Sequence, residues 1–226
     1  MSLFTRSLPE IDVRAENLNG HDSGDADFHL HLMSLPGLFR NHLDQFPESG
    51  HFLHADKTRV EKWKNRLEAL GIGPKIGLCW RSFNPSWRKR PFSSDLGDLE
   101  PILRRTGAVF VNLQGDECAE EIEAVNRRFG CSIHSFEDLD LKNNAEETAA
   151  LLAALDMVVS CRCWITAFCG ALGTPTFCYS APFNIVMMDL DYDPWAPTTR
   201  VFYRKYDEDW GLCMRAISVA LADQFG

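Results

Sequence analysis

The chain has 226 residues, of which 45% are hydrophobic, and a formal net charge of −9 at neutral pH. This length suits one large α/β domain, or one domain with part of another. The acidic balance, without a basic tail or stripe, excludes a general nucleic-acid-binding role. The sequence shows no apolar run of membrane-spanning length and no signal peptide, so we expect a cytoplasmic protein without a membrane span.

The first 55 residues differ in character from the rest of the chain. Residues 1–26 are polar and irregular, and residues 28–55 hold short apolar pieces interrupted by Pro36, Pro47 and several glycines. Such composition is typical of connecting segments. We therefore predict an irregular lead-in over 1–55, either a linker or the remnant of a preceding domain, and one domain over 56–226.

From residue 56 onward, helical and extended patterns alternate. Helices are predicted over residues 57–70, 96–105, 117–129, 144–155, 164–172 and 209–225, and strands over 75–80, 108–113, 132–136, 157–160, 176–179 and 199–203. Asp116 and Asn144 are predicted N-caps, and Glu147 would complete a capping box with Asn144. The alternation predicts an α/β fold: a Rossmann-like, doubly wound, mostly parallel sheet of about six strands with helices on both faces.

In such a sheet, ligands bind beyond the carboxyl ends of the strands. The loop after the first predicted strand carries a basic island in an acidic protein, formed by Arg81, Arg88, Lys89 and Arg90, together with the hydroxyl of Ser82. Arginine makes bidentate contacts to phosphate, and neighbouring aromatic residues could stack on a base. The loop is predicted to bind an anion; the alternative is a solvated basic turn.

Two further turns lie at the same predicted edge. Gln114 and Gly115 follow the second strand, where an amide or the backbone could meet a ligand, although a simple capped turn fits equally well. Arg162, Cys163 and Trp164 lead into the helix over 164–172, whose N-terminus favours phosphate. This turn lacks the glycines that let a phosphate approach the backbone, and it holds no acid or base.

The eight cysteines form no paired CxxC motifs. Cys79, Cys169 and Cys178 fall inside apolar patterns, where cysteine acts as a small hydrophobic residue. Cys161 and Cys163 could join a metal site or a redox pair, but the paired spacing of zinc sites is absent. We predict no metal ligands.

Several motifs, in order, resemble the C-terminal nucleotide-binding half of GT-B glycosyltransferases, of the bacterial type attached to tetratricopeptide repeats. The chain is similar in this respect to O-linked N-acetylglucosamine transferases and lipopolysaccharide heptosyltransferases. The matching motifs are LMSLPGLF (32–39), the helix with Trp63, IGLCWRS (76–82), FVNLQGDECAEEI (110–122), DLDLK (138–142), AALLAALDMVVS (149–160), GALGTPTF (170–177) and DPWAPTTRVFYR (193–204). Together they cover about residues 27–222.

The resemblance implies a nucleotide-sugar donor, with the loop over 81–90 near its phosphates and Gln114 near the nucleotide. It implies no cofactor and no metal. In the family the turn before the GALG helix usually reads Asp-Thr-Ser, followed by a His. Here those positions read Arg162-Cys163-Trp164 and Ala167. A complete GT-B enzyme also has an N-terminal acceptor domain, so the resemblance implies a fragment, a subunit that needs a partner, or a degenerate relative.

Two functions therefore remain open, and the sequence leaves the sugar, base, acceptor and oligomeric state undecided. The first is the donor-binding domain of a glycosyltransferase, working with an N-terminal GT-B half or a tetratricopeptide-repeat partner. The second is a non-catalytic GT-B-like module for assembly or ligand sensing, with a docking face on segment 28–39 or on the final helix, through Trp210, Leu212, Ile217 and Leu221. An epimerase-like dinucleotide enzyme is disfavoured because the glycine fingerprint is missing.

Overall fold

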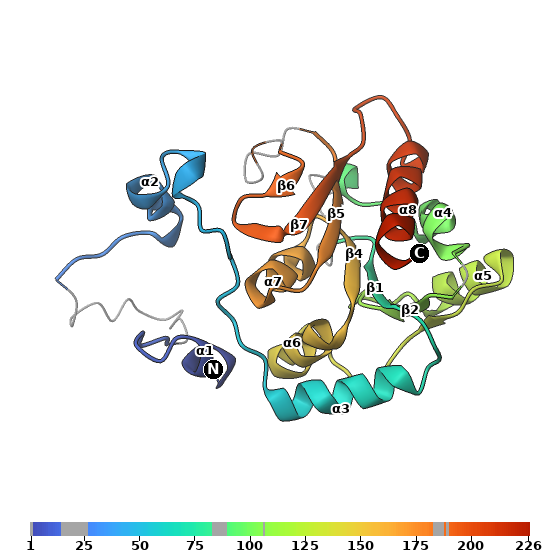
Figure 1. The fold of residues 1–226 in the computed structure, drawn as a ribbon, viewed down its shortest axis with the longest axis horizontal. Coiled ribbons are helices and arrows are strands. Elements are labelled where there is room, and N and C mark those ends of the chain that lie inside the picture. The colour runs from blue at the N-terminus through green and yellow to red at the C-terminus, as the bar shows by residue number, and fades with distance from the viewer. Residues whose placement is uncertain (1, 15–26, 83–89, 106, 183–187, 189) are drawn as a thin grey trace.

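The computed structural model describes residues 2–14, 27–82, 90–105, 107–182, 188 and 190–226. Their strands form one sheet in the order β3-β2-β1-β4-β5-β7-β6 (Figure 1). The strands are β1 (Lys75–Cys79), β2 (Val109–Asn112), β3 (Ile133–His134), β4 (Met157–Cys161), β5 (Thr176–Ser180), β6 (Tyr192–Asp193) and β7 (Ala196–Tyr203). All neighbouring strands are parallel except β6 and β7. The predicted α/β, mostly parallel architecture is confirmed.

The chain changes direction across the sheet between β1 and β4. It runs outward from β1 through β2 to β3, and then returns to place β4 on the other side of β1. The two central strands are in register from Ile76 opposite Met157 to Cys79 opposite Ser160. At such a switch point the loops that follow the two strands diverge, which leaves a crevice at their carboxyl ends.

Helices cover both faces of this sheet (Figure 1). One face carries α3 (Lys57–Glu68), α6 (Ala145–Ala154) and α7 (Trp164–Leu172), and the other carries α4 (Glu100–Leu103), α5 (Ala119–Phe129) and α8 (Gly211–Phe225). Each layer has its own buried cluster against the strands, because residues that alternate along a strand point to opposite faces. In β1, for example, Leu78 belongs to the α8 side and Cys79 to the α3 side.

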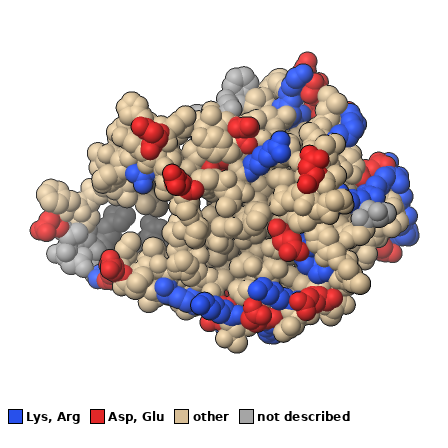
Figure 2. All heavy atoms as spheres, viewed as in Figure 1, with Lys and Arg blue, Asp and Glu red and all other residues tan. Residues whose placement is uncertain are grey.

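The α3–α6 pair shows how local sequence builds one of these layers. The Asp56 carboxylate caps α3 by accepting a hydrogen bond from the Arg59 amide, 3.0 Å away. Trp63 and Leu67, one turn apart, are buried, and the Trp63 indole donates to the Glu147 carboxylate at 2.8 Å. Figure 2 shows that the outer side of α3, along the lower rim of the molecule, carries charged residues of both signs. The helix is therefore held by one apolar stripe.

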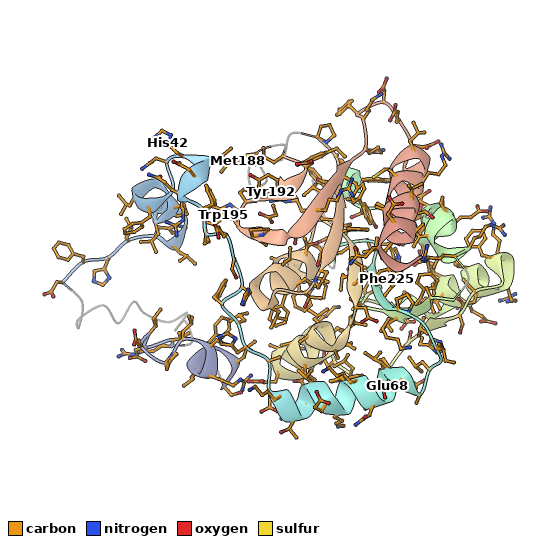
Figure 3. The ribbon with its side chains drawn as sticks, viewed as in Figure 1. His42, Glu68, Met188, Tyr192, Trp195 and Phe225 are labelled. Carbon is orange, nitrogen blue, oxygen red and sulfur yellow. The ribbon has the colours of Figure 1, made fainter. Side chains whose placement is uncertain are left out.

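The described part of the N-terminal 55 residues lies along the α7 side of the sheet. It contains four short helical segments, α1 (Ser2–Ser7), η1 (Leu32–Ser34), α2 (Pro36–Phe39) and η2 (Leu43–Gln45). Leu3 and Leu53 are buried, and the ring of Phe46 contacts the ring of Trp195 edge-on, with 4.7 Å between their centroids. Figure 3 labels Trp195, which lies close to the N-terminal helical segments around His42. Large apolar side chains between these anchors are exposed: Phe28, Leu30, Leu32, Leu35, Leu38, Phe39 and Leu43.

Three of the differences from the sequence predictions have a clear physical reason. The helix expected over 96–105 splits into a 3-10 turn, η4 (Leu96–Leu99), and the short α4, because Pro101 has no N–H to continue the hydrogen-bond ladder. The helix expected from 117 begins at Ala119 with Cys118 as N-cap, since Asp116 pairs with Arg81 instead. The two residues of β6 add a seventh strand that is too short to leave a periodic signal.

The predicted docking role of the final helix is wrong for most of its apolar residues. Ile217, Leu221 and Trp210 are buried in this domain's own core, and of the four predicted docking residues only Leu212 is substantially exposed. The capping box is also partial: Asn144 accepts from the Glu147 amide at 3.2 Å, but the Glu147 carboxylate reaches α3. No helix in the described part of the chain is long and apolar enough to cross a membrane.

Candidate functional site

The carboxyl edge of the central strands gathers the predicted site residues. Arg81 follows β1, Gln114 follows β2 and Arg162 follows β4, and these strands are parallel neighbours. Side-chain contacts join the three loops: Gln114 bonds the backbone of Arg81, and the thiols of Cys79 and Cys163 lie 3.6 Å apart. The candidate site is therefore the switch point between β1 and β4, together with the neighbouring end of β2.

Gln114 holds the loop after β1 in place. Its side chain is buried, and its carbonyl oxygen accepts hydrogen bonds from the backbone N–H groups of Trp80 at 3.2 Å and Arg81 at 3.1 Å. Its amide nitrogen donates to the Arg81 carbonyl at 3.1 Å. The side chain thus satisfies backbone groups that β1 leaves unpaired where the strand ends. Gly115, next in the chain, is half-buried at the same edge.

Arg81 is neutralised by two carboxylates. Its guanidinium lies 2.9 Å from the Asp116 carboxylate and 2.5 Å from that of Glu121, and it also donates to the Glu117 carbonyl at 3.3 Å. Burial alone would lower the pKa of Arg81, but the hydrogen bonds to Asp116 and Glu121 raise it above its ordinary value. The positive charge is therefore already compensated within the protein.

The basic loop leaves and rejoins the sheet at nearly the same point. The Ser94 amide donates to the Trp80 carbonyl at 2.9 Å, and the hydroxyls of Ser94 and Tyr179 are 2.8 Å apart. The Trp210 indole donates to the Ser93 carbonyl at 3.1 Å. The described residues on either side of the basic loop are thus fixed to β1, β5 and the start of α8.

The structure describes only some of the predicted phosphate-binding residues of this loop. The Ser82 amide donates to the Ser93 hydroxyl at 3.4 Å, at the base of the loop. Arg88 lies outside the described residues. Arg90 begins the 3-10 turn η3 (Arg90–Phe92), but its side chain also lies outside the description. These three assignments stay predictions.

The turn after β4 presents Arg162 beside the start of α7. The Arg162 amide donates to the Tyr179 carbonyl at 3.2 Å, which fixes the backbone, while its half-buried guanidinium forms no ion pair with any carboxylate in the described ranges. Trp164 begins α7, and its ring packs against Phe168, with 5.6 Å between centroids. Trp164 thus joins the partly buried residues on the α3–α6–α7 face.

A buried carboxyl group feels the charge of Arg162. Asp193 is buried, and burial raises its pKa above the ordinary value of 3.8. A hydrogen bond from the Trp195 amide, 2.9 Å from the Asp193 carboxylate, and the positive charge of Arg162 both lower that pKa, but they do not offset the burial. Within the described residues, Arg162 therefore acts on Asp193 through its charge without forming an ion pair with it.

The structure also assembles a thiol cluster, in which Cys79 joins Cys161 and Cys163, the two cysteines considered together from the sequence. The sulfur atoms of Cys79, Cys161 and Cys163 all lie within 4.8 Å of one another. Hydrogen bonds from Cys161 and Cys79 lower the pKa of the Cys163 thiol well below its ordinary value, and the same contact with Cys163 raises the pKa of Cys161. From the sequence, Cys79 is expected to be a core residue only. The sequence does not show that β1 pairs with β4, and this pairing brings Cys79 close to Cys161 and Cys163.

Comparisons with known proteins agree on the fold. No family model matches the chain. Protein FlbA of Caulobacter vibrioides is 36% identical over 240 aligned positions, which cover 98% of this chain and 39% of FlbA. Among solved structures, the E. coli ADP-heptose LPS heptosyltransferase II matches with a TM-score of 0.53 and 13% identity, over 82% of this chain and 59% of that chain. The chain therefore shares the fold of one part of this GT-B protein.

Two further solved structures support the same fold. The E. coli heptosyltransferase WaaC with ADP gives a TM-score of 0.51 and 15% identity, over 73% of this chain and 48% of that one. A glycosyl transferase family 9 protein from Veillonella parvula gives 0.50 and 12% identity, over 80% and 47%. The chain therefore spans about half the length of these enzymes, and about two fifths of FlbA.

Proposed function

We propose that this domain binds the nucleotide diphosphate part of an activated sugar and serves as the donor half of a glycosyltransferase. The observation that carries the proposal is Arg162, an arginine without an ion-pair partner in the described part of the chain, at the switch point and beside the start of α7. Switch points of open α/β sheets are where ligands bind. One protein of the same fold is described with bound ADP.

The two arginines of the edge would have different tasks. Arg81 is bound to Asp116 and Glu121, so it would hold the loop rather than contact phosphate. Arg162 would contact the diphosphate directly. It lies next to the first N–H groups of α7, which have no hydrogen-bond acceptor within the helix and can therefore donate to a phosphate. Ser82, Arg88, Arg90, Gly115 and the turn at Cys163 and Trp164 would complete the predicted site.

This arrangement would assist sugar transfer through electrostatics. When the sugar leaves, negative charge develops on the diphosphate, and preorganised donors that face this charge lower the barrier. Arg162 and the start of α7 would supply the compensation that other enzymes obtain from a metal ion. We therefore propose that donor binding is metal-independent.

A second structural unit would supply the acceptor. The exposed apolar residues of segment 28–43 support this proposal, because such patches mark interaction sites. We propose that an N-terminal GT-B half, or a tetratricopeptide-repeat partner, covers this segment. Its docking would place an acceptor opposite the carboxyl edge of the sheet.

Isothermal titration of the folded chain with UDP, GDP, ADP and CMP, without metal, tests the proposal. One nucleotide should bind saturably, and Arg162→Ala should weaken it about 10- to 100-fold, because a hydrogen bond to a charged group contributes about 1.5–3 kcal/mol. Arg200→Ala is the matched control. Arg200 is exposed in the middle of β7, where it stacks on Phe202, 4.8 Å from its guanidinium carbon to the ring centroid.

Two results would count against the donor-binding proposal. If a folded sample bound none of the four nucleotides, the non-catalytic module would be the better explanation. If Arg162→Ala and Arg200→Ala weakened binding equally, the effect would reflect net charge and not a site at the switch point.

A further inference from the structure

Three cysteine side chains from three elements meet beneath the turn that carries Arg162. Cys79 is the last residue of β1, Cys161 is the last of β4, and Cys163 is the N-cap of α7. Their sulfur atoms lie within 4.8 Å of one another, and the Cys79–Cys163 pair is 3.6 Å apart. Three sulfur atoms bound to one ion at about 2.3 Å lie about 4 Å apart. The spacing therefore fits a single metal ion.

The surroundings of the cluster suit a thiolate site. The Ser160 hydroxyl lies 3.5 Å from the Cys163 sulfur, and the Gln114 side-chain oxygen lies 3.6 Å from the Cys79 sulfur, so polar groups surround two of the three sulfurs. Cys163 is also at a helix N-terminus, which favours negative charge. It is only partly buried, whereas Cys79 and Cys161 are fully buried, so an ion could enter past it.

The cluster is more than core packing with small residues. Cys163 packs against the buried clusters of both sheet faces, whereas Cys161 belongs to one and Cys79 to the other. The three thiols thus lie at the edge of the sheet, between the buried clusters of its two faces. Within the described ranges, no other group of three histidine, cysteine or acidic side chains has metal-binding spacing.

We propose that Cys79, Cys161 and Cys163 bind one thiophilic metal ion, Zn²⁺ or Cu⁺, through their three thiolates. Thiolate ligands select these ions, and each thiol that binds releases its proton to solvent. The ion would tie the start of α7 to the end of β1 and so fix the turn that carries Arg162. The metal proposal does not rest on the proposed nucleotide site, although Cys163 belongs to both, because its test measures metal binding alone.

The test uses the whole chain, reduced and freed of metal. Zn²⁺ alone and Cu⁺ alone are titrated in separate arms, against a competing chelator of known affinity. We expect about one ion per chain and an upward shift in Tm with at least one of the two ions. Co²⁺ is added in a parallel sample, because a thiolate-to-cobalt absorption band reports sulfur ligation without any mutation.

Two cysteine variants separate the cluster from thiols in general. Cys163→Ser should weaken metal binding about 100-fold or more, because loss of outer-shell partners alone costs about 10- to 100-fold. Cys131→Ser is the matched control, since Cys131 is also partly exposed but stands apart from the cluster. Circular dichroism confirms that each variant is folded.

Three results would overturn the proposal. One is failure of both Zn²⁺ and Cu⁺ to bind the wild-type chain at one equivalent, with no cobalt–sulfur band. Another is equal binding by Cys163→Ser and Cys131→Ser. The third is that the chain binds no ion but forms a Cys79–Cys163 disulfide under mild oxidation, seen as a mass loss of about 2 Da, which would make the cluster a redox pair.

Discussion

Arg81 and Arg162 stand at the same edge of the sheet, yet their surroundings are opposite. Arg81 follows β1 and is held by Asp116 and Glu121, with its backbone fixed by Gln114. Arg162 follows β4, and within the described residues it forms no ion pair, although its charge lowers the pKa of the buried Asp193. Arg81, whose charge is compensated inside the protein, organises structure, whereas we propose that Arg162 keeps its charge for a ligand. Residue type alone does not separate these tasks.

The largest expected effect is the loss of Gln114. Gln114→Ala should lower the free energy of unfolding by about 3 kcal/mol, because the Trp80 and Arg81 amides and the Arg81 carbonyl would lose their partner in a buried position. For a chain of this size that is a fall in Tm of about 6–12 °C. Urea unfolding followed by tryptophan fluorescence measures it.

Gln224→Ala is the control for this substitution, since Gln224 is exposed near the end of α8 and should change stability by less than about 0.5 kcal/mol. If both variants were equally stable, Gln114 would not hold the loop, and its predicted role as a direct nucleotide contact would gain weight. Retained stability together with lost nucleotide affinity would be the clearest form of that result.

The second effect concerns Arg81 itself. Arg81→Met should destabilise the chain by about 1–2 kcal/mol, because Asp116 and Glu121 would face each other without their cation. Nucleotide affinity should change less than threefold, in contrast to Arg162→Ala. Thermal unfolding and isothermal titration on the same samples compare the two arginines directly.

The triple variant Arg81→Met, Asp116→Asn, Glu121→Gln should recover most of the lost stability, because no uncompensated charge remains. Added salt should likewise reduce the defect of the single variant by screening the two carboxylates. If Arg81→Met instead abolished nucleotide binding and left Tm unchanged, Arg81 would be a ligand residue and the contrast with Arg162 would fail.

The sequence could predict features that depend on local patterns, but not those that depend on the order of the strands. The strands and most helices follow from apolar periodicity and capping residues such as Asp56 and Asn144, so the α/β alternation was readable. That the loops after β1, β2 and β4 share one edge also follows from a parallel sheet. The sequence does not predict which strands are neighbours, because long-range packing sets the order of the strands in the sheet.

The thiol cluster and the ion pairs of Arg81 depend on that sheet order. Cys79 lies beside β4 only because the chain reverses direction between β3 and β4, and no local pattern records the reversal. Asp116 had a plausible local role as an N-cap, yet its carboxylate binds an arginine from another loop. Local rules therefore brought these residues to one edge of the sheet but could not assign tasks to them.

The smallest expected effect tests the charge interaction between Arg162 and Asp193. Asp193→Asn should raise the free energy of unfolding by about 0.5–1 kcal/mol at pH 7, because it removes a buried charge while an amide oxygen can still accept the hydrogen bond from the Trp195 amide. Burial raises the pKa of Asp193 in the folded chain above 3.8, so the folded state binds this proton more tightly than the unfolded state does. Ionised Asp193 therefore destabilises the fold at neutral pH, and the gain from Asn should shrink as the pH falls toward 3.8 and below.

Combining the two sites completes this test. Arg162 lowers the pKa of Asp193, so in an Arg162→Ala background the carboxylate loses that support and Asp193→Asn should stabilise the chain more than it does in the wild type. Urea unfolding of the four chains, at pH 7 and at pH 4, gives this coupling. A coupling of zero at pH 7 would mean that Arg162 does not act on Asp193 at all, and its whole charge would be available to a ligand. A coupling above about 1.5 kcal/mol would mean that the two form a true buried pair, which would make Arg162 resemble Arg81 and remove the reason for assigning it to phosphate.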